Sequence, residues 1–169
     1  MDSNILAARI GGKQSETAAS SDGLTGFPEQ QQTMNAAMRL DQATIVLVED
    51  DPDSRESLTL LLEAEGAQVC AVADAEEGVE AAMRLLPDAV VCDLDLPAMD
   101  GFYLIQRLRD HEICGGHAPS VAVALTGHTD EAYRLRSIGE GFQFFMTKPA
   151  LPDDLVTLLH DAIDARAAG

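Results

Sequence analysis

The sequence predicts an α/β fold in which helices cover both faces of a five-stranded parallel sheet. Five short runs of β-branched or apolar residues alternate with stretches in which apolar residues recur every three or four positions. The runs are almost continuously apolar, as expected for strands that are buried on both faces. This alternation is typical of βαβ units, which build doubly wound sheets with ligand sites at the carboxyl ends of the strands.

The expected strands and helices follow one another from residue 44 onward. The strands cover residues 44–48 (TIVLV), 67–72 (AQVCAV), 88–92 (DAVVC), 120–125 (SVAVAL) and 142–146 (FQFFM). Helical spacing is clearest at Leu58, Leu61 and Leu62, at Val79, Ala82, Met83 and Leu86, and at Leu155, Leu158, Leu159, Ala162 and Ile163. A fourth helix is expected over residues 129–138, and the remaining one follows residue 100.

Several residues mark the expected starts of these helices, because aspartate accepts hydrogen bonds from the free N–H groups of a first turn. The expected caps are Asp51, Asp53 (in a capping box with Glu56), Asp74 (in a capping box with Glu77) and Asp100. Proline suits the first turn, where its missing N–H costs nothing, so Pro152 is expected to open the last helix.

The chain is strongly acidic, which argues against two classes of partner. Its 29 acidic and 11 basic residues give a net charge of −18, and residues 43–169 alone carry −16. Such a surface repels nucleic acid and anionic membranes, since phosphate binding requires clustered Lys and Arg. We therefore expect neither direct nucleic-acid binding nor membrane association.

Residues 1–42 differ in composition from residues 43–169. Their mixture of Gly, Ser, Thr and Gln has no helical or strand period, which predicts a disordered or linker-like extension ahead of one domain. Within the extension, residues 34–40 (MNAAMRL) could form a short helix. The start of the chain lacks the apolar core of a signal peptide, and its three cysteines are too widely spaced for a disulfide framework. These features predict a cytoplasmic, reduced protein.

Reactive side chains follow four of the expected strands. They are Glu49 and Asp50 after the first strand, Asp93 and Asp95 after the third, Thr126 after the fourth and Lys148 after the fifth. Neighbouring carboxylates disfavour one another's ionised form unless a cation joins them, and Mg²⁺ is a hard cation that prefers oxygen ligands. A carboxylate nucleophile, a metal and a lysine are the groups needed to move a phosphoryl group onto aspartate.

Four separated motifs, IVLVEDDPDSRE, VVCDLDLPAMDG, ALTGH and FFMTKP, resemble the receiver domain of bacterial two-component response regulators. The resemblance covers residues 43–167, and Pro97 and Gly101 stand four and eight residues after Asp93, as the family pattern requires. It implies a flavodoxin-like (βα)5 fold with strand order 2-1-3-4-5. Two of the motifs are also similar to receivers attached to hybrid histidine kinases.

The resemblance implies a metal site and a phosphoacceptor. Asp93 would accept the phosphoryl group and, with Asp50, bind Mg²⁺ directly, or Mn²⁺ as the alternative ion. Glu49 would act on the metal through a water molecule, and the backbone carbonyl of Asp95 would be a further ligand.

The remaining roles implied by the resemblance concern contacts and switching. Thr126 and Lys148 would contact the phosphoryl group, and the Lys148–Pro149 peptide bond would be cis. Thr126 and Phe145 would form the switch that responds to phosphorylation. Asp95, two residues after Asp93, and His128, two residues after Thr126, lie where members of the family vary and would tune the phosphoryl lifetime.

The implied function is that of a phosphoacceptor in a phosphorelay. A histidine kinase or histidine phosphotransfer protein would donate from a phosphohistidine to Asp93. The domain would then contact a downstream protein through the face formed by the fourth helix, the fifth strand and the fifth helix, with no DNA-binding output domain in this chain. It would catalyse only its own phosphorylation and dephosphorylation, and it could be a stand-alone protein or a module of a hybrid kinase.

Two other functions and one other site compete with this interpretation. The DLD of residues 93–95 also resembles the DxD signature of haloacid-dehalogenase-type phosphatases, although those enzymes need no acidic pair upstream. A phosphorylation-independent interaction module is disfavoured by the complete set of reactive side chains. Zinc binding by His111, Cys114 and His117 lacks a fourth ligand nearby, so a solvated loop is the preferred interpretation.

Overall fold

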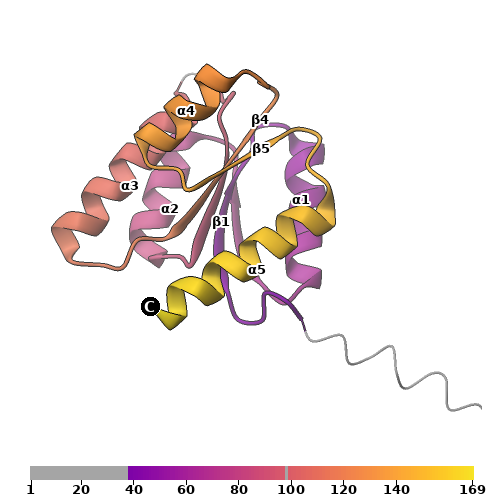
Figure 1. Ribbon diagram of the computed structural model, residues 1–169. Coiled ribbons are helices and arrows are strands. Elements are labelled where there is room, and N and C mark those ends of the chain that lie inside the picture. The colour runs from indigo at the N-terminus through magenta and orange to yellow at the C-terminus, as the bar shows by residue number, and fades with distance from the viewer. Residues whose placement is uncertain (1–37, 98) are drawn as a thin grey trace, which may run out of the picture. The chain divides into compact units, whose positions relative to one another are not determined.

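The computed structural model describes residues 38–97 and 99–169, within which strands and helices alternate strictly (Figure 1). The strands are β1 (Thr44–Val48), β2 (Gln68–Val72), β3 (Ala89–Asp93), β4 (Val121–Thr126) and β5 (Phe144–Thr147). The helices are α1 (Pro52–Ala64), α2 (Ala75–Leu85), α3 (Gly101–Gly115), α4 (Glu131–Glu140) and α5 (Pro152–Ala168).

The five strands form one parallel sheet in the order β2-β1-β3-β4-β5, which confirms the predicted flavodoxin-like fold. The order reverses direction between β1 and β3, and this is where doubly wound sheets bind their ligands. In the register of these two strands Val48 lies opposite Cys92, so the residues that follow β1 lie beside the end of β3. The register alone therefore brings the acidic residues after β1 close to Asp93.

Helices cover both faces of the sheet and create two separate apolar clusters. Helices α1 and α5 lie on one face, and α2, α3 and α4 lie on the other (Figure 1). Successive strand residues point to opposite faces, so Val46 and Val48 pack with α2 and α3 whereas Ile45 and Leu47 pack with α1 and α5. The sheet is thus buried on both sides and fixes the positions of the strand ends.

Most helix starts agree with the sequence, but the prediction for Asp53 was wrong. The cap of α1 is Asp51, whose carboxylate accepts a hydrogen bond of 2.8 Å from the backbone N–H of Ser54. Pro52 occupies the first helical position, for which its fixed φ angle is suited, and this leaves Asp53 inside the first turn. The other predicted caps, Asp74 and Asp100, are confirmed. Helix α4 begins two residues later than predicted, after its own cap Asp130.

The residues just ahead of β1 are attached to two helices. Leu40 is only 2% exposed and belongs to the cluster under α1 and α5. The guanidinium of Arg39 contacts Glu65 at 2.7 Å and Asp153 at 3.0 Å, and it donates to the hydroxyl of Thr157 at 3.3 Å. Residues 39–42 form a turn; residues 34–37 of the expected short helix lie outside the described residues. We call Arg39 and its three partners the Arg39 clasp.

The Arg39 clasp predicts a specific dependence of stability on pH. The hydrogen bond from Arg39 holds the pKa of Glu65 below its usual 4.5, so the ion pair contributes stability above that pH and loses it as the pH falls through the lowered value. Arg39→Gln is expected to be less stable than the wild type at pH ~7, and the difference should shrink at pH ~3. Urea unfolding at both pH values measures it; an equal difference at both would contradict the prediction.

Within residues 38–97 and 99–169, no helix combines the length and the apolar character needed to cross a membrane.

Candidate functional site

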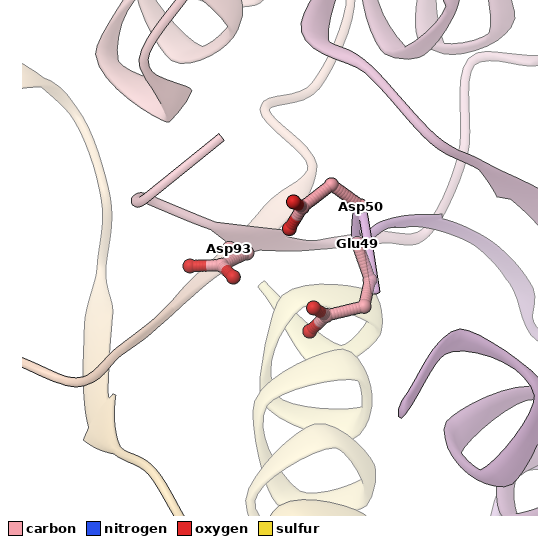
Figure 2. A group of neighbouring side chains, drawn as sticks. All are labelled: Glu49, Asp50 and Asp93. Atoms are coloured by element: carbon pink, nitrogen blue, oxygen red, sulfur yellow. The ribbon is translucent and has the colours of Figure 1, made fainter. Parts of the chain in front are cut away.

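Three carboxylates gather at the carboxyl ends of β1 and β3 (Figure 2). Glu49 and Asp93 are 1% and 4% exposed, whereas Asp50 is open to solvent. Each offers an oxygen atom, and these oxygens all lie within 4.8 Å of one another. In Figure 2 the side chains project from neighbouring strand ends into one shared space. Among the described residues this is the one group of three acidic, His or Cys side chains with such spacing.

Lys148 reaches this acidic group from the end of β5. Its ammonium donates to Glu49 Oε2 at 2.7 Å and to Asp93 Oδ2 at 2.6 Å. The backbone N–H of Lys148 donates to the carbonyl of Thr126 at 2.7 Å, which fixes the chain as it leaves β5. The Lys148–Pro149 peptide bond is cis. One cation thus joins two carboxylates that come from different strands.

Burial and neighbouring charges act in opposite directions on the pKa values of Glu49 and Lys148. Burial raises the pKa of Glu49, and the bond to Lys148 offsets only part of that effect. For Lys148, burial alone would lower the pKa, but hydrogen bonds and charges from Asp93 and Glu49 outweigh it and the net pKa is raised. The lysine is therefore firmly cationic and balances negative charge at the site.

The second oxygen of Asp93 is also engaged. Asp93 Oδ1 accepts a hydrogen bond of 2.8 Å from the backbone N–H of Asp95. The side chain of Asp95 turns toward the end of β4, where its Oδ2 accepts from the Thr126 hydroxyl and the Gly127 N–H, both at 3.2 Å. Its Oδ1 lies 3.1 Å from Nε2 of His128. Asp95 thus links the phosphoacceptor candidate to the β4–α4 connection.

The donor set fits a hard divalent cation. Three oxygen-bearing side chains lie close together, and Mg²⁺ binds oxygen ligands through one or two carboxylates while keeping several waters. One side of the site is open, because a groove of about 680 Å³ runs past Glu49 and Lys148 between α1 and the β5–α5 connection. Water can therefore reach Glu49 and Lys148 from this side, and Asp50 is itself open to solvent.

Most of the sequence-predicted residues meet at this one edge of the sheet. Glu49, Asp50, Asp93, Thr126, Lys148, Asp95 and His128 are brought together by the ends of β1, β3, β4 and β5. Phe145 lies on β5 opposite Ala124, partly buried against the cluster under α3 and α4. One residue was missed: Tyr133, whose ring lies 4.3 Å from that of His128. The one feature of the sequence that could have pointed to Tyr133 is its position three residues after Asp130, at the start of a helix.

The three possible zinc ligands, His111, Cys114 and His117, lie in α3 or just after its end. His111 and Cys114 lie on α3, which extends to Gly115, so the expected loop is shorter than the sequence suggested. The rings of His111 and His117 are 5.8 Å apart, and Cys114 is an exposed free thiol. They do not form a group of three close ligands among the described residues, but residues 111–115 are helical, so the prediction of a solvated loop was wrong for most of this segment.

The sequence pattern of the response regulator receiver domain matches residues 45–160. The chain belongs to this family. A protein of Leptolyngbya boryana, described as an uncharacterized 14.6 kDa protein in the sodA1 3' region, is 40% identical over 120 residues, covering 71% of this chain and 89% of that protein. The DNA-binding response regulator MtrA of Mycolicibacterium smegmatis is 32% identical, covering 66% of this chain and 46% of that protein. The receiver chain thus spans about half of that regulator.

Solved receiver structures have the same arrangement of elements. A CheY-like response regulator receiver domain protein from Methanospirillum hungatei JF-1 has a TM-score of 0.67 and 25% identity, and the match covers 76% of this chain and 98% of that one. A protein from Chloroflexus aurantiacus J-10-fl, named as a putative response regulator, has a TM-score of 0.66 and 29% identity, and the match covers 73% of this chain and 99% of that one. The receiver fold of this chain is thereby established.

Proposed function

We propose that this receiver domain accepts a phosphoryl group on Asp93 from the phosphohistidine of a histidine kinase or histidine phosphotransfer protein. The observation that carries the proposal is the buried Asp93 carboxylate, which lies within 4.8 Å of two further carboxylates and 2.6 Å from the Lys148 ammonium. Membership of the receiver family supports this function over a haloacid-dehalogenase-type phosphatase. The complete set of reactive side chains supports it over an interaction module that works without phosphorylation.

The transfer is a displacement at phosphorus. An oxygen of the Asp93 carboxylate forms the new P–O bond, the P–N bond to the donor imidazole breaks, and the departing imidazole keeps the electron pair of that bond and takes a proton from water. Lys148 and the Thr126 hydroxyl stabilise the phosphoryl oxygens by donating to them. Asp50, Asp93, the carbonyl of Asp95 and, through a water, Glu49 would hold Mg²⁺, which when bound supplies positive charge at the site.

The signal is read on the face formed by α4, β5 and α5. Leu135 and Ile138 of α4 are 57% and 45% exposed, although apolar side chains usually gain by burial, so they offer contact area to a downstream protein. Thr126 and Phe145 lie on neighbouring strands β4 and β5. When Thr126 turns toward a phosphoryl oxygen, the space available to Phe145 changes, and the populations of two conformations of this face shift.

The mass of the intact protein after incubation with acetyl phosphate and Mg²⁺ tests the proposal. The wild type and Asp110→Asn, which changes an exposed aspartate of α3, are expected to gain one phosphoryl group, whereas Asp93→Asn gains none. Chelation of Mg²⁺ should abolish the gain. A wild type that consumes the donor continuously without becoming labelled would instead indicate a phosphatase. Absence of both labelling and consumption would contradict phosphorylation by small donors, and a phosphohistidine protein would then be the donor to use.

A further inference from the structure

The Asp95 carboxylate engages the Thr126 hydroxyl, a donor that the proposed function assigns to the phosphoryl group. Its Oδ2 accepts hydrogen bonds from both the Thr126 hydroxyl and the backbone N–H of Gly127. Two donors that converge on one anionic oxygen form an oxyanion-binding pair. The Thr126 hydroxyl oxygen also accepts from the N–H of His128 at 3.0 Å, so its donating and accepting capacities are both engaged. In the structure this donor pair is already occupied by a carboxylate.

Asp95 is held in this position from the side of α4. His128 Nε2 lies 3.1 Å from Asp95 Oδ1, and the imidazole stacks on the ring of Tyr133 with centroids 4.3 Å apart. The Tyr133 ring in turn meets the edge of the buried Phe102 at 5.6 Å. Aromatic contacts of this kind add stabilisation beyond that of buried area. Asp95 is therefore connected through two rings to the packed interface of α3 and α4.

We propose that Asp95 occupies the position of a phosphoryl oxygen in the resting protein, and that His128 and Tyr133 hold it there. This inference rests on the proposed function of Asp93. The Thr126 hydroxyl has one proton to donate and cannot serve the Asp95 carboxylate and a phosphoryl oxygen at once, so the Asp95 side chain must swing away before transfer is complete. Asp95 is a competing internal ligand, and Tyr133 is a positioning residue that acts through His128.

The same contacts give the site a connection to α4. Tyr133 is the third residue of that helix, which begins at Glu131. When Asp95 leaves the donor pair, His128 loses the carboxylate beside its Nε2, and the stack at the start of α4 is free to rearrange. This connection runs through β4–α4 side chains and is separate from the proposed coupling of Thr126 on β4 to Phe145 on β5.

Labelling rates with acetyl phosphate and Mg²⁺ provide the test. Asp95→Ala removes the competing ligand and is expected to be labelled about tenfold faster than the wild type. Loss of one hydrogen bond to a charged group changes an equilibrium constant by about this factor. Tyr133→Leu changes no charge and is expected to be labelled about threefold faster, because it removes only the aromatic support of His128. Tyr133→Phe keeps the ring and should match the wild type. Tyr103→Leu, on the exposed side of α3, is the matched control.

A second measurement examines the contact without phosphorylation. The amide resonance of Gly127 should move in Asp95→Ala and in Tyr133→Leu, but not in Tyr103→Leu, because only the first two disturb its carboxylate acceptor. An unmoved Gly127 resonance, or labelling of Asp95→Ala and Tyr133→Leu at the wild-type rate, would overturn the inference while Asp93 remains the phosphoacceptor. If neither the wild type nor any variant is labelled by any donor, the proposed function fails and this inference fails with it.

Discussion

Replacing Asp50 with asparagine is expected to weaken Mg²⁺ binding at least about tenfold, a loss of about 1.4 kcal/mol, and to reduce phosphoryl labelling to background. Asp50 is the exposed member of the acidic group, and its oxygen lies within 4.8 Å of those of Glu49 and Asp93. Asparagine keeps the size of the side chain but removes one of three negative charges. Because the other two carboxylates are already paired with Lys148, Asp50 carries the charge that is most available to a cation.

Asp51 provides a neighbouring control for this prediction. It differs from Asp50 by one position, but its carboxylate caps α1 by accepting from Ser54 and is not part of the acidic group. Asparagine is as good a helix cap as aspartate, so Asp51→Asn should retain both Mg²⁺ affinity and stability. Since the chain contains no Trp, binding is best followed by titration calorimetry. Equal losses of affinity in both variants would show that only the general negative charge matters.

Replacing Gly101 with alanine is expected to destabilise the protein by about 2 kcal/mol and to slow labelling of Asp93. A Cβ atom at this position would lie 2.8 Å from the backbone carbonyl oxygen of Asp93 and 2.9 Å from the Cys92 sulfur. Contacts this short force an atom to move, and here one of the atoms belongs to the backbone of Asp93, the proposed phosphoacceptor. Urea unfolding measures the stability, and the intact-mass assay measures the rate.

Gly139 is the matched glycine for this comparison. It lies within α4, and a Cβ atom there would meet no other atom within 4 Å. Gly139→Ala should therefore be neutral or more stable by about 0.5–1 kcal/mol, because alanine reduces the conformational freedom of the unfolded chain. Wild-type stability and wild-type labelling in Gly101→Ala would show that the backbone around Asp93 adapts to the added methyl group without cost.

Periodicity and turn chemistry were sufficient to predict the elements of this fold. Strands that are buried on both faces are apolar throughout, so β1, β3 and β4 were located within one residue at each end. Errors occurred where two local signals overlapped. Asp51 and Asp53 both precede apolar helical positions, and only the fixed φ of Pro52 between them decides which one is the cap. The order of the strands was available only from the family resemblance.

The candidate site was predictable as a set of residues but not as a set of contacts. Because the strands are parallel, Glu49 and Asp93 had to approach one another once their strands were adjacent. The Asp95 side chain contacts Thr126 and His128, which lie more than 30 positions further along the chain. Such side-chain conformations are determined by packing between elements, and no spacing in the sequence reports them.

The Arg39 clasp has a mechanical consequence. Tension applied to the chain ahead of Met38 would first act on the contacts of Arg39 with Glu65 and Asp153, and so would be divided between α1 and α5. The buried Leu40 and its backbone hydrogen bond to Glu65 would then have to give way before the load reaches β1. This strand is hydrogen-bonded to β2 on one side and to β3 on the other, so it can be pulled out only by breaking both ladders together. The contacts of Arg39 and the two hydrogen-bonded ladders of β1 therefore resist a force that is applied to the chain ahead of Met38.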